Sequence, residues 1–329
     1  MSAQHKVRWG IIAAGGIAGK VAPSIAAGEG GELVAIASRN LDKAQAFAKD
    51  KKIPRAYGAY EALLADREVD AVYITTPNSR HHDDVLAAAR AGKHILCEKP
   101  MAATAREVES MFDATSRAGV VMMEAFMYRC HPLAQTILKT VRDGAIGRVQ
   151  MIHSTFGFRL GQGHEDNIRL RRELQGGGLM DVGCYCLNFA RALAGAEPDR
   201  LAASAQIGAS GVDEWMSASL GFPNGATATI ICAVQCQTGA VTQVWGDQGM
   251  LEVNNPWWGG EPEARFQLKR VGEKQAQPVV VAADRKHYQY QIEAMNAAIL
   301  RGAALPLTRE DAVGNARAIE ALRRAVGLS

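Results

Sequence analysis

Short apolar segments alternate with helical patterns over the first 124 residues of the chain. The candidate strands are residues 7–13, 33–37, 70–74, 94–97 and 120–124. Strands that are apolar along their length and are separated by helices are buried on both faces and pair in parallel. We therefore predict an α/β protein whose N-terminal part is a doubly wound parallel sheet of five or six strands.

The pattern changes after Glu124. The candidate strands are now residues 149–158, 215–222, 226–234 and 240–245, and the candidate helices are residues 132–142, 178–195, 286–301 and 309–326. Asn224-Gly225 lies between two of these strands and is a strong hairpin signal. We predict a second domain of the α+β class with a large, mostly antiparallel open sheet. The expected division is 1–123 and 124–329, with the final helices able to pack back toward the first domain.

Composition limits the classes of function. The net charge of +3 is too small to indicate nucleic acid or an anionic membrane as a partner. No apolar run approaches the ~20 residues of a membrane-spanning helix, and residues 1–6 show no signal-peptide pattern, so we expect a cytoplasmic protein. Six cysteines are scattered in apolar contexts without a Cys-x-x-Cys pair, which predicts reduced thiols and neither a disulfide framework nor a zinc site.

A turn of small residues joins the first predicted strand to the first helix. It reads Ala13-x-Gly15-x-x-Ala18, and Gly15, Gly16 and Ile17 would open the helix. Such a turn lets the backbone approach a pyrophosphate, which a helix N-terminus favours electrostatically. Ala13 stands where the dinucleotide fingerprint has its first glycine. The same residues are also compatible with an ordinary strand-to-helix turn.

The second strand ends in Ser38-Arg39-Asn40, without an acidic residue. Enzymes that use NAD carry a carboxylate near this point for the ribose hydroxyl, and a carboxylate would repel a 2′-phosphate. Arginine binds a phosphate through two parallel hydrogen bonds. Ser38 and Arg39 therefore predict NADP as the cofactor, with NAD possible. The alternative is a solvated loop arginine.

Two further strand ends carry polar residues. Thr76-Pro77-Asn78 follows the strand at 70–74 and forms a turn suited to lie against a cofactor, and His81 follows at the start of a helix. We expect His81 near the nicotinamide half of the site, and no metal there, because His81 and His82 diverge on a helix. Glu98 and Lys99 follow the strand at 94–97, and ligands of open α/β sheets bind at such carboxyl ends. A surface ion pair is the alternative.

Asp181 and Tyr185 are four residues apart in the predicted helix that follows Gly176-Gly177-Gly178. This spacing puts both side chains on one face, which is otherwise apolar. A phenol beside a carboxylate and a lysine can transfer a proton to or from a carbinol oxygen. A helix cap and a core tyrosine are the structural alternative.

Taken in order, these motifs resemble those of the glucose–fructose oxidoreductase/inositol dehydrogenase (Gfo/Idh/MocA) family over essentially the whole chain. The resemblance rests on the glycine turn, Thr76-Pro77-Asn78, Glu98-Lys99-Pro100 and Asp181-x-x-x-Tyr185. Arg169–Leu174 with the glycines that follow is similar to the glucose–fructose oxidoreductases, and Asn255–Trp258 to NADP-dependent dihydrodiol and D-xylose dehydrogenases.

The resemblance implies an N-terminal Rossmann domain that binds a nicotinamide cofactor, and hydride transfer at an alcohol carbon. It implies catalytic roles for Lys99, Asp181 and Tyr185. It implies substrate contacts for Phe156, Arg169, Asp181 and Trp258. It also implies a homodimer or homotetramer formed through the C-terminal sheet.

We therefore expect an NADP-dependent oxidoreductase that acts on a sugar, polyol or cyclic diol. Two alternatives stay open at this point. One is an aldose–ketose transhydrogenase that retains its NADP, and the other is a non-catalytic NADP-binding sensor, since a fold alone does not establish activity.

Overall fold

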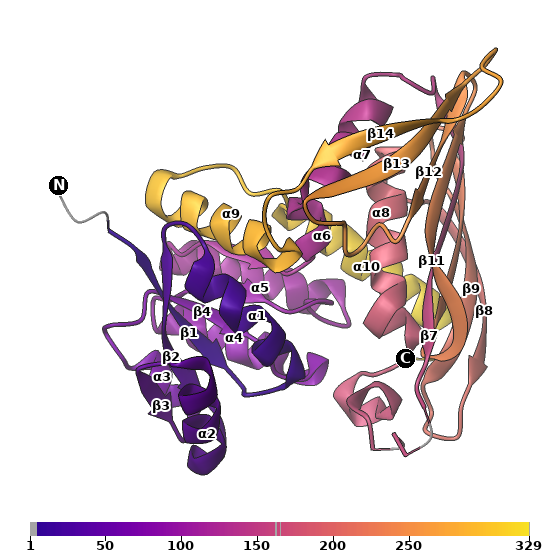
Figure 1. Cartoon of the computed structure of the whole chain (residues 1–329). Helices are drawn as coiled ribbons and strands as arrows, with labels where there is room; N and C mark the ends of the chain where they lie inside the picture. The colour runs from indigo at the N-terminus through magenta and orange to yellow at the C-terminus, as the bar shows by residue number, and fades with distance from the viewer. Residues whose placement is uncertain (1–4, 162, 165, 329) are drawn as a thin grey trace. The chain divides into compact units, whose positions relative to one another are not determined.

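The computed structural model describes residues 5–161, 163–164 and 166–328. Their Cα atoms form two compact units. The first unit comprises the chain through Ala102, Arg106–Cys130 and Lys286–Ala312, and the second comprises Ala103–Ala105, His131–Arg285 and the chain from Val313. Each unit is built around its own sheet (Figure 1).

The sheet of the first unit has six strands. They are β1 (Val7–Ile12), β2 (Gly31–Ala37), β3 (Arg55–Tyr57), β4 (Ala71–Ile74), β5 (His94–Cys97) and β6 (Met122–Glu124). Their order is β3-β2-β1-β4-β5-β6 and all neighbours are parallel. The order reverses direction at β1 and β4, and ligands of such sheets bind beside that switch point. The predicted doubly wound parallel sheet is confirmed.

Helices pack around this sheet. They are α1 (Gly16–Ala27), α2 (Leu41–Lys51), α3 (Tyr60–Leu64), α4 (His81–Arg90), α5 (Ala105–Ala118), α6 (Met127–Cys130) and α9 (His287–Arg301). Strands β1, β4 and β5 in the middle of the sheet are buried along almost their whole length, as apolar strands between helices require. Helix α9 comes from far along the chain, and its Asn296 accepts a hydrogen bond from Trp9 Nε1 at 2.9 Å.

The sheet of the second unit has eight strands. They are β7 (Val149–Arg159), β8 (Arg200–Ile207), β9 (Asp213–Gly221), β10 (Thr227–Ala233), β11 (Gln235–Gly246), β12 (Gly249–Asn254), β13 (Glu263–Arg270) and β14 (Gln277–Ala282). Their order is β14-β13-β12-β11-β7-β10-β9-β8. The pairing is antiparallel except between β7 and β10, so the mostly antiparallel open sheet is confirmed. Gly225 of the predicted Asn224-Gly225 turn has φ +87° between β9 and β10.

The helices of this unit are α7 (Pro132–Arg142), α8 (Cys184–Ala194) and most of α10 (Arg309–Ala325), which contains the boundary between the units. Figure 1 shows α7 and α8 along one face of the large sheet. Alternate residues of β9 and β10 are buried on that face and exposed on the other. No helix in the described part of the chain is long and apolar enough to span a membrane.

Candidate active site

The turn between β1 and α1 has the features of a phosphate site. Ala13 has φ +78°, so it takes the conformation that a glycine adopts more readily, and Thr75 Oγ1 donates to its carbonyl at 2.8 Å. Gly15 precedes α1 without a side-chain cap, and no acidic residue lies in the first turn. A Cβ at Gly15 or Gly16 would meet no atom within 4 Å, so the space in front of the helix is open. These residues fit the pyrophosphate of a dinucleotide, and Ile17 follows as the second helical residue.

Arg39 follows β2 on the surface, after the buried Ser38. Asn40 is occupied as the N-cap of α2, where its side chain accepts from Lys43 N at 2.9 Å. Arg39 lies close to the hydroxyl of Tyr60: burial raises the pKa of Tyr60, and the guanidinium opposes that rise. An exposed guanidinium with no acid among residues 38–41 suits a 2′-phosphate.

The turn after β4 is tied to the turn after β5. His81 is fully buried, with Nε2 at 2.9 Å from Thr76 O and Nδ1 at 3.0 Å from Pro100 O. Burial lowers the pKa of His81. Thr76 Oγ1 also donates to Asp84 at 2.7 Å. The imidazole thus joins two backbone turns from inside the unit, and Pro77 and Asn78 follow Thr76 at the start of a 3-10 turn.

Glu98 and Lys99 follow β5 as predicted, and residues from elsewhere in the unit hold the carboxylate. Glu98 is buried and accepts hydrogen bonds from the hydroxyl of Tyr73 in β4 and from Lys99 N, the latter at 3.2 Å. Burial and Glu98 together raise the pKa of Tyr288 in α9. The backbone of the half-buried Lys99 is therefore held in place, which restricts where its side chain can reach. Tyr73 and Tyr288 were not predicted as site residues, because nothing in their local sequence distinguishes them from other buried tyrosines.

Asp181 and Tyr185 occupy one continuous helix in the second unit, but its beginning differs from the prediction. Residues Leu179–Gly183 form a π-helical turn, in which Cys184 N donates to Leu179 O, five residues earlier. Helix α8 continues with α-helical geometry. Asp181 lies inside the π turn, and Tyr185 lies just after it. Such turns are rare and are frequent at functional sites.

Arg169 pairs with Asp181. Its Nε is 2.5 Å from Asp181 Oδ2, and its guanidinium carbon lies 5.6 Å from the centre of the Phe158 ring. The sequence named Arg169 and Asp181 separately, and the structure brings them together. Among the described residues, no three His, Cys, Asp or Glu side chains converge as metal ligands would.

The ring of Tyr185 lies in an aromatic cluster, which we define as Phe156, Tyr185, Phe189 and Trp257. The centroids of Phe156, Tyr185 and Trp257 are each 5.6 Å from one another, and Phe189 is 5.9 Å from Trp257. Trp257 is fully buried, whereas the neighbouring Trp258 is 38% exposed. The sequence singled out Phe156 and Trp258, and it missed Trp257.

Comparison with known proteins identifies the family. Residues 7–126 match the model of the GFO/IDH/MocA oxidoreductase family with its NAD-binding Rossmann fold, and residues 134–252 match the GFO/IDH/MocA C-terminal domain. The chain belongs to this family. The predicted resemblance is therefore confirmed, and the protein is an oxidoreductase by family.

Two relatives and one solved structure illustrate the similarity. D-xylose 1-dehydrogenase (NADP(+)) 2 of Haloferax volcanii is 40% identical over 321 residues, which are 95% of each chain. Trans-1,2-dihydrobenzene-1,2-diol dehydrogenase of Mus musculus is 35% identical over 255 residues, 76% of this chain and 75% of the relative. The crystal structure of aldose-aldose oxidoreductase from Caulobacter crescentus, complexed with glycerol, has a TM-score of 0.89 and 31% identity over 98% of both chains.

Proposed function

We propose that this chain is an NADP-dependent oxidoreductase that transfers a hydride between the nicotinamide and a CH–OH carbon of a sugar, polyol or cyclic diol. The observation that carries the proposal is that the first unit holds the groups suited to a dinucleotide, whereas the second holds the groups suited to a substrate hydroxyl. The first unit offers a phosphate-ready turn, Arg39 and Lys99. The second offers Asp181 and a buried phenol on one helix.

NADP is supported by two independent observations. Arg39 follows β2 where NAD enzymes have an acid, and Ser38 gives no competing charge. The relative from Haloferax volcanii is named as an enzyme of NADP(+). We therefore assign the 2′-phosphate to Arg39, and the pyrophosphate to the amides around Gly15 and Gly16. The wall of this site would be formed by the turn Thr76-Pro77-Asn78. The buried imidazole of His81 would support it by contacting the carbonyl of Thr76.

The protein's own groups account for the proton transfer. When bound, the cofactor supplies a nicotinamide C4 that accepts or returns the hydride. In the oxidative direction, Tyr185 takes the proton from the substrate hydroxyl, and Lys99 donates to the substrate oxygen, as the family resemblance implies. A free tyrosine titrates near 10, so a positive charge that stabilises the phenolate is needed at neutral pH. Glu98 holds Lys99 in place and does not transfer the proton.

Asp181 would orient a second substrate hydroxyl. The guanidinium of Arg169 pairs with the carboxylate of Asp181 and fixes its direction through the 2.5 Å contact. Phe156 and Trp258 would offer apolar surface to a sugar ring or a cyclic diol. Sugars and diols are the substrates named for the relatives from Haloferax volcanii and Mus musculus.

The test is a panel of aldoses, polyols and trans-diols assayed for NADPH absorbance with the purified protein. Tyr185→Phe should then lower kcat by about 10²–10⁴-fold and leave NADP affinity nearly unchanged. The matched control is Tyr57→Phe, which removes a hydroxyl that donates to Asp66 at 2.8 Å, outside the proposed site. A Tyr185→Phe enzyme with near-normal kcat would refute the proton-transfer role.

The similarity to an aldose-aldose oxidoreductase favours transhydrogenation with retained cofactor as a second candidate. In that reaction one sugar is oxidised and another is reduced on the same bound dinucleotide. Purified protein that still shows 340 nm absorbance after desalting and reaction with an aldose would support this candidate. Protein that turns over only with added NADP would support cofactor exchange.

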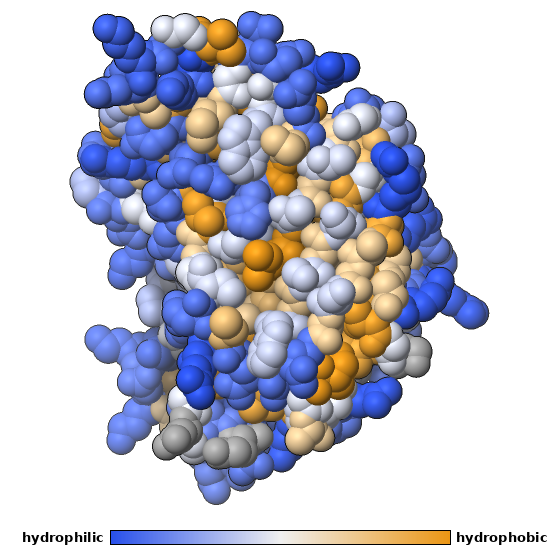
Figure 2. Space-filling view, turned by 90° about the vertical axis from the view of Figure 1, so that its right-hand side faces the viewer, coloured by the Kyte–Doolittle hydropathy of each residue, from blue (hydrophilic) through white to orange (hydrophobic). Residues whose placement is uncertain are grey.

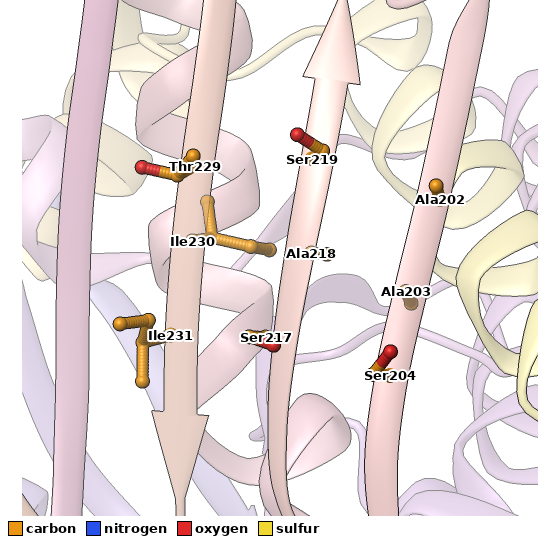
Figure 3. A pocket seen from close by; sticks show the side chains of 9 residues that line it. All are labelled: Ala202, Ala203, Ser204, Ser217, Ala218, Ser219, Thr229, Ile230 and Ile231. Carbon is orange, nitrogen blue, oxygen red and sulfur yellow. The ribbon is translucent and has the colours of Figure 1, made fainter.

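We also propose a homodimer, or a dimer of dimers, formed through the open face of the large sheet. Figure 2 shows pale and orange side chains gathered over the middle of the face that it views. On the sheet, Met151 is 53% and Trp215 43% exposed. A hollow on β8, β9 and β10 is lined by small and apolar side chains, three from each strand (Figure 3). Exposed apolar patches of this kind mark association surfaces.

Light scattering tests the assembly. Trp215→Glu should shift the protein toward monomer, whereas Val271→Glu, on an exposed residue just after β13, should not. A wild-type monomer at micromolar concentration would contradict the proposal. We further propose a cytoplasmic location, which the burial of five of the six cysteines as apolar side chains supports.

A further inference from the structure

A buried carboxylate caps the helix that carries the proposed proton-transfer groups. Asp213 is the first residue of β9 and is 1% exposed. Its Oδ2 accepts from Leu179 N at 2.6 Å, and the N–H of Gly178 also interacts with the carboxylate. These amides belong to the first turn of the helix, where N–H groups have no partner within the helix. Asp213 therefore fills the role of an N-cap from a distant strand.

The three glycines before the helix make room for this contact. A Cβ on Gly177 would collide with Asp213 Oδ1, and a Cβ on Gly178 would lie 3.3 Å from Oδ2. Gly177 has φ +113°, which disfavours other residues as well. A Cβ on Gly176 would collide with the backbone of Arg169, and Gly177 N donates to Arg169 O at 2.8 Å. One small segment thus joins the cap to the arginine that pairs with Asp181.

We propose that Asp213 is a positioning residue for the reaction: its carboxylate fixes the π turn and thereby the direction of Asp181 relative to Tyr185. The proposal rests on the function proposed above for Asp181 and Tyr185. A cap that is lost leaves first-turn amides without partners, so the turn changes shape before the rest of the helix does. Tyr185 is further along and is held by the aromatic cluster, so the expected change falls on Asp181 and Arg169.

The groups around Asp213 make the cap sensitive to pH. Arg323 of α10 faces it and favours the carboxylate, whereas Cys232 of β10 is a buried thiol whose pKa burial raises. Burial outweighs the favourable contacts and raises the pKa of Asp213 to about 6. A carboxylate only accepts hydrogen bonds, but a protonated carboxyl also carries an O–H donor that cannot face an amide N–H. The two amides bond best to the carboxylate, so protonation weakens the cap as pH falls through 6, although protonating the buried group stabilises the folded chain as a whole over the unfolded chain.

The first experiment compares wild type with Asp213→Asn, using a substrate from the panel. We expect kcat to fall about five- to tenfold, as the loss of one cap contact implies, while KM for NADP stays unchanged. The wild-type kcat should also decline as pH falls below 6, and the pH profile of Asp213→Asn should lack this decline. Asp199→Asn is the matched control, because the side chain of Asp199 is exposed and forms an ion pair with the exposed Arg200. Wild-type kcat and pH profile in Asp213→Asn would overturn the proposal.

The second experiment uses the wild-type protein alone, so it depends neither on enzymatic activity nor on whether a variant folds. Amide hydrogen exchange of residues 178–182 is measured in the wild-type protein at pH 5 and pH 7.5 and corrected for intrinsic rates. We expect protection of these amides to fall about fivefold or more at pH 5, while amides of residues 188–194 keep theirs. If the wild type turns over no substrate, the proposed function fails but this measurement still decides the cap. Equal protection of residues 178–182 at both pH values would overturn it.

Discussion

Burial of Asp213 predicts that part of the folding stability decreases as pH rises. Its pKa is raised from 3.8 to about 6, because burial disfavours the charge more than Leu179, Gly178 and Arg323 favour it. The folded chain therefore binds this proton more tightly than the unfolded chain does. Stability from this group is fully present below about pH 4 and is lost as pH rises through 6.

The magnitude follows from the two pKa values. A pKa that is about two higher in the folded chain corresponds to about 3 kcal/mol. Linkage places about half of this between pH 7.5 and pH 5. Asp213→Asn removes the titrating group. Lowering the pH from 7.5 to 5 should therefore raise the unfolding free energy of the wild type relative to the variant by about 1.5 kcal/mol.

Urea unfolding, followed by tryptophan fluorescence, measures this difference at the two pH values. The comparison of each protein with itself cancels any constant cost of the substitution. Asp199→Asn changes the same functional group on the surface and should follow the wild type at both pH values. If Asp213→Asn and the wild type change in parallel between pH 7.5 and pH 5, the carboxyl does not titrate near 6 and the reasoning is refuted.

Three further predictions concern the two units. Arg39→Ala should weaken NADP binding at least tenfold and leave NAD binding nearly unchanged, since the lost phosphate contact is worth about 1.5–3 kcal/mol; equal affinities for both cofactors in the wild type would contradict the assignment. Trp257→Ala should cost about 3–5 kcal/mol in unfolding free energy, because the side chain is fully buried, whereas Trp258→Ala should cost under about 1 kcal/mol; equal costs would be inconsistent with the packing. A double-mutant cycle of Arg169→Met and Asp181→Asn should give a coupling of about 1 kcal/mol in unfolding, and a coupling near zero would show that the ion pair contributes nothing to stability.

The fold was predictable where hydrophobic periodicity is strong. The helix expected over residues 132–142 is α7, and the strand expected over 149–158 is β7 with one more residue. The sequence missed β3, which is three residues long, and β8, whose residues are mostly small and half-exposed at the sheet edge. Short or edge strands carry too little apolar alternation to stand out. The parallel pairing of β7 with β10 also gave no local signal, because it depends on how distant strands assemble.

The groups proposed for chemistry were visible in the sequence, but the groups around them were not. Asp181 and Tyr185 could be paired by helical spacing, although the π turn between them could not be foreseen. The sequence analysis selected Trp258, but the ring beside Tyr185 is that of Trp257. A loop has no periodicity that would show which of two neighbouring residues points inward. Asp213 was missed because its partner amides lie far earlier in the chain.

Tyr73 and Asp213, two of the residues that the sequence missed, share one property: each holds a polar group at the end of an element. Glu98 is held by Tyr73, and Asp213 holds the turn that carries Asp181. Buried carboxylates cost stability, as the raised pKa of Asp213 shows, so packing alone does not account for them. What they provide is a definite direction for Lys99 and for Asp181, which a proton transfer or an oriented hydroxyl requires within a fraction of an ångström. Substitutions at Tyr73 and Asp213 should therefore lower kcat more than they weaken binding. In Asp213→Asn the unfolding free energy should also change less between pH 5 and pH 7.5 than in the wild type, because the titrating carboxyl is gone.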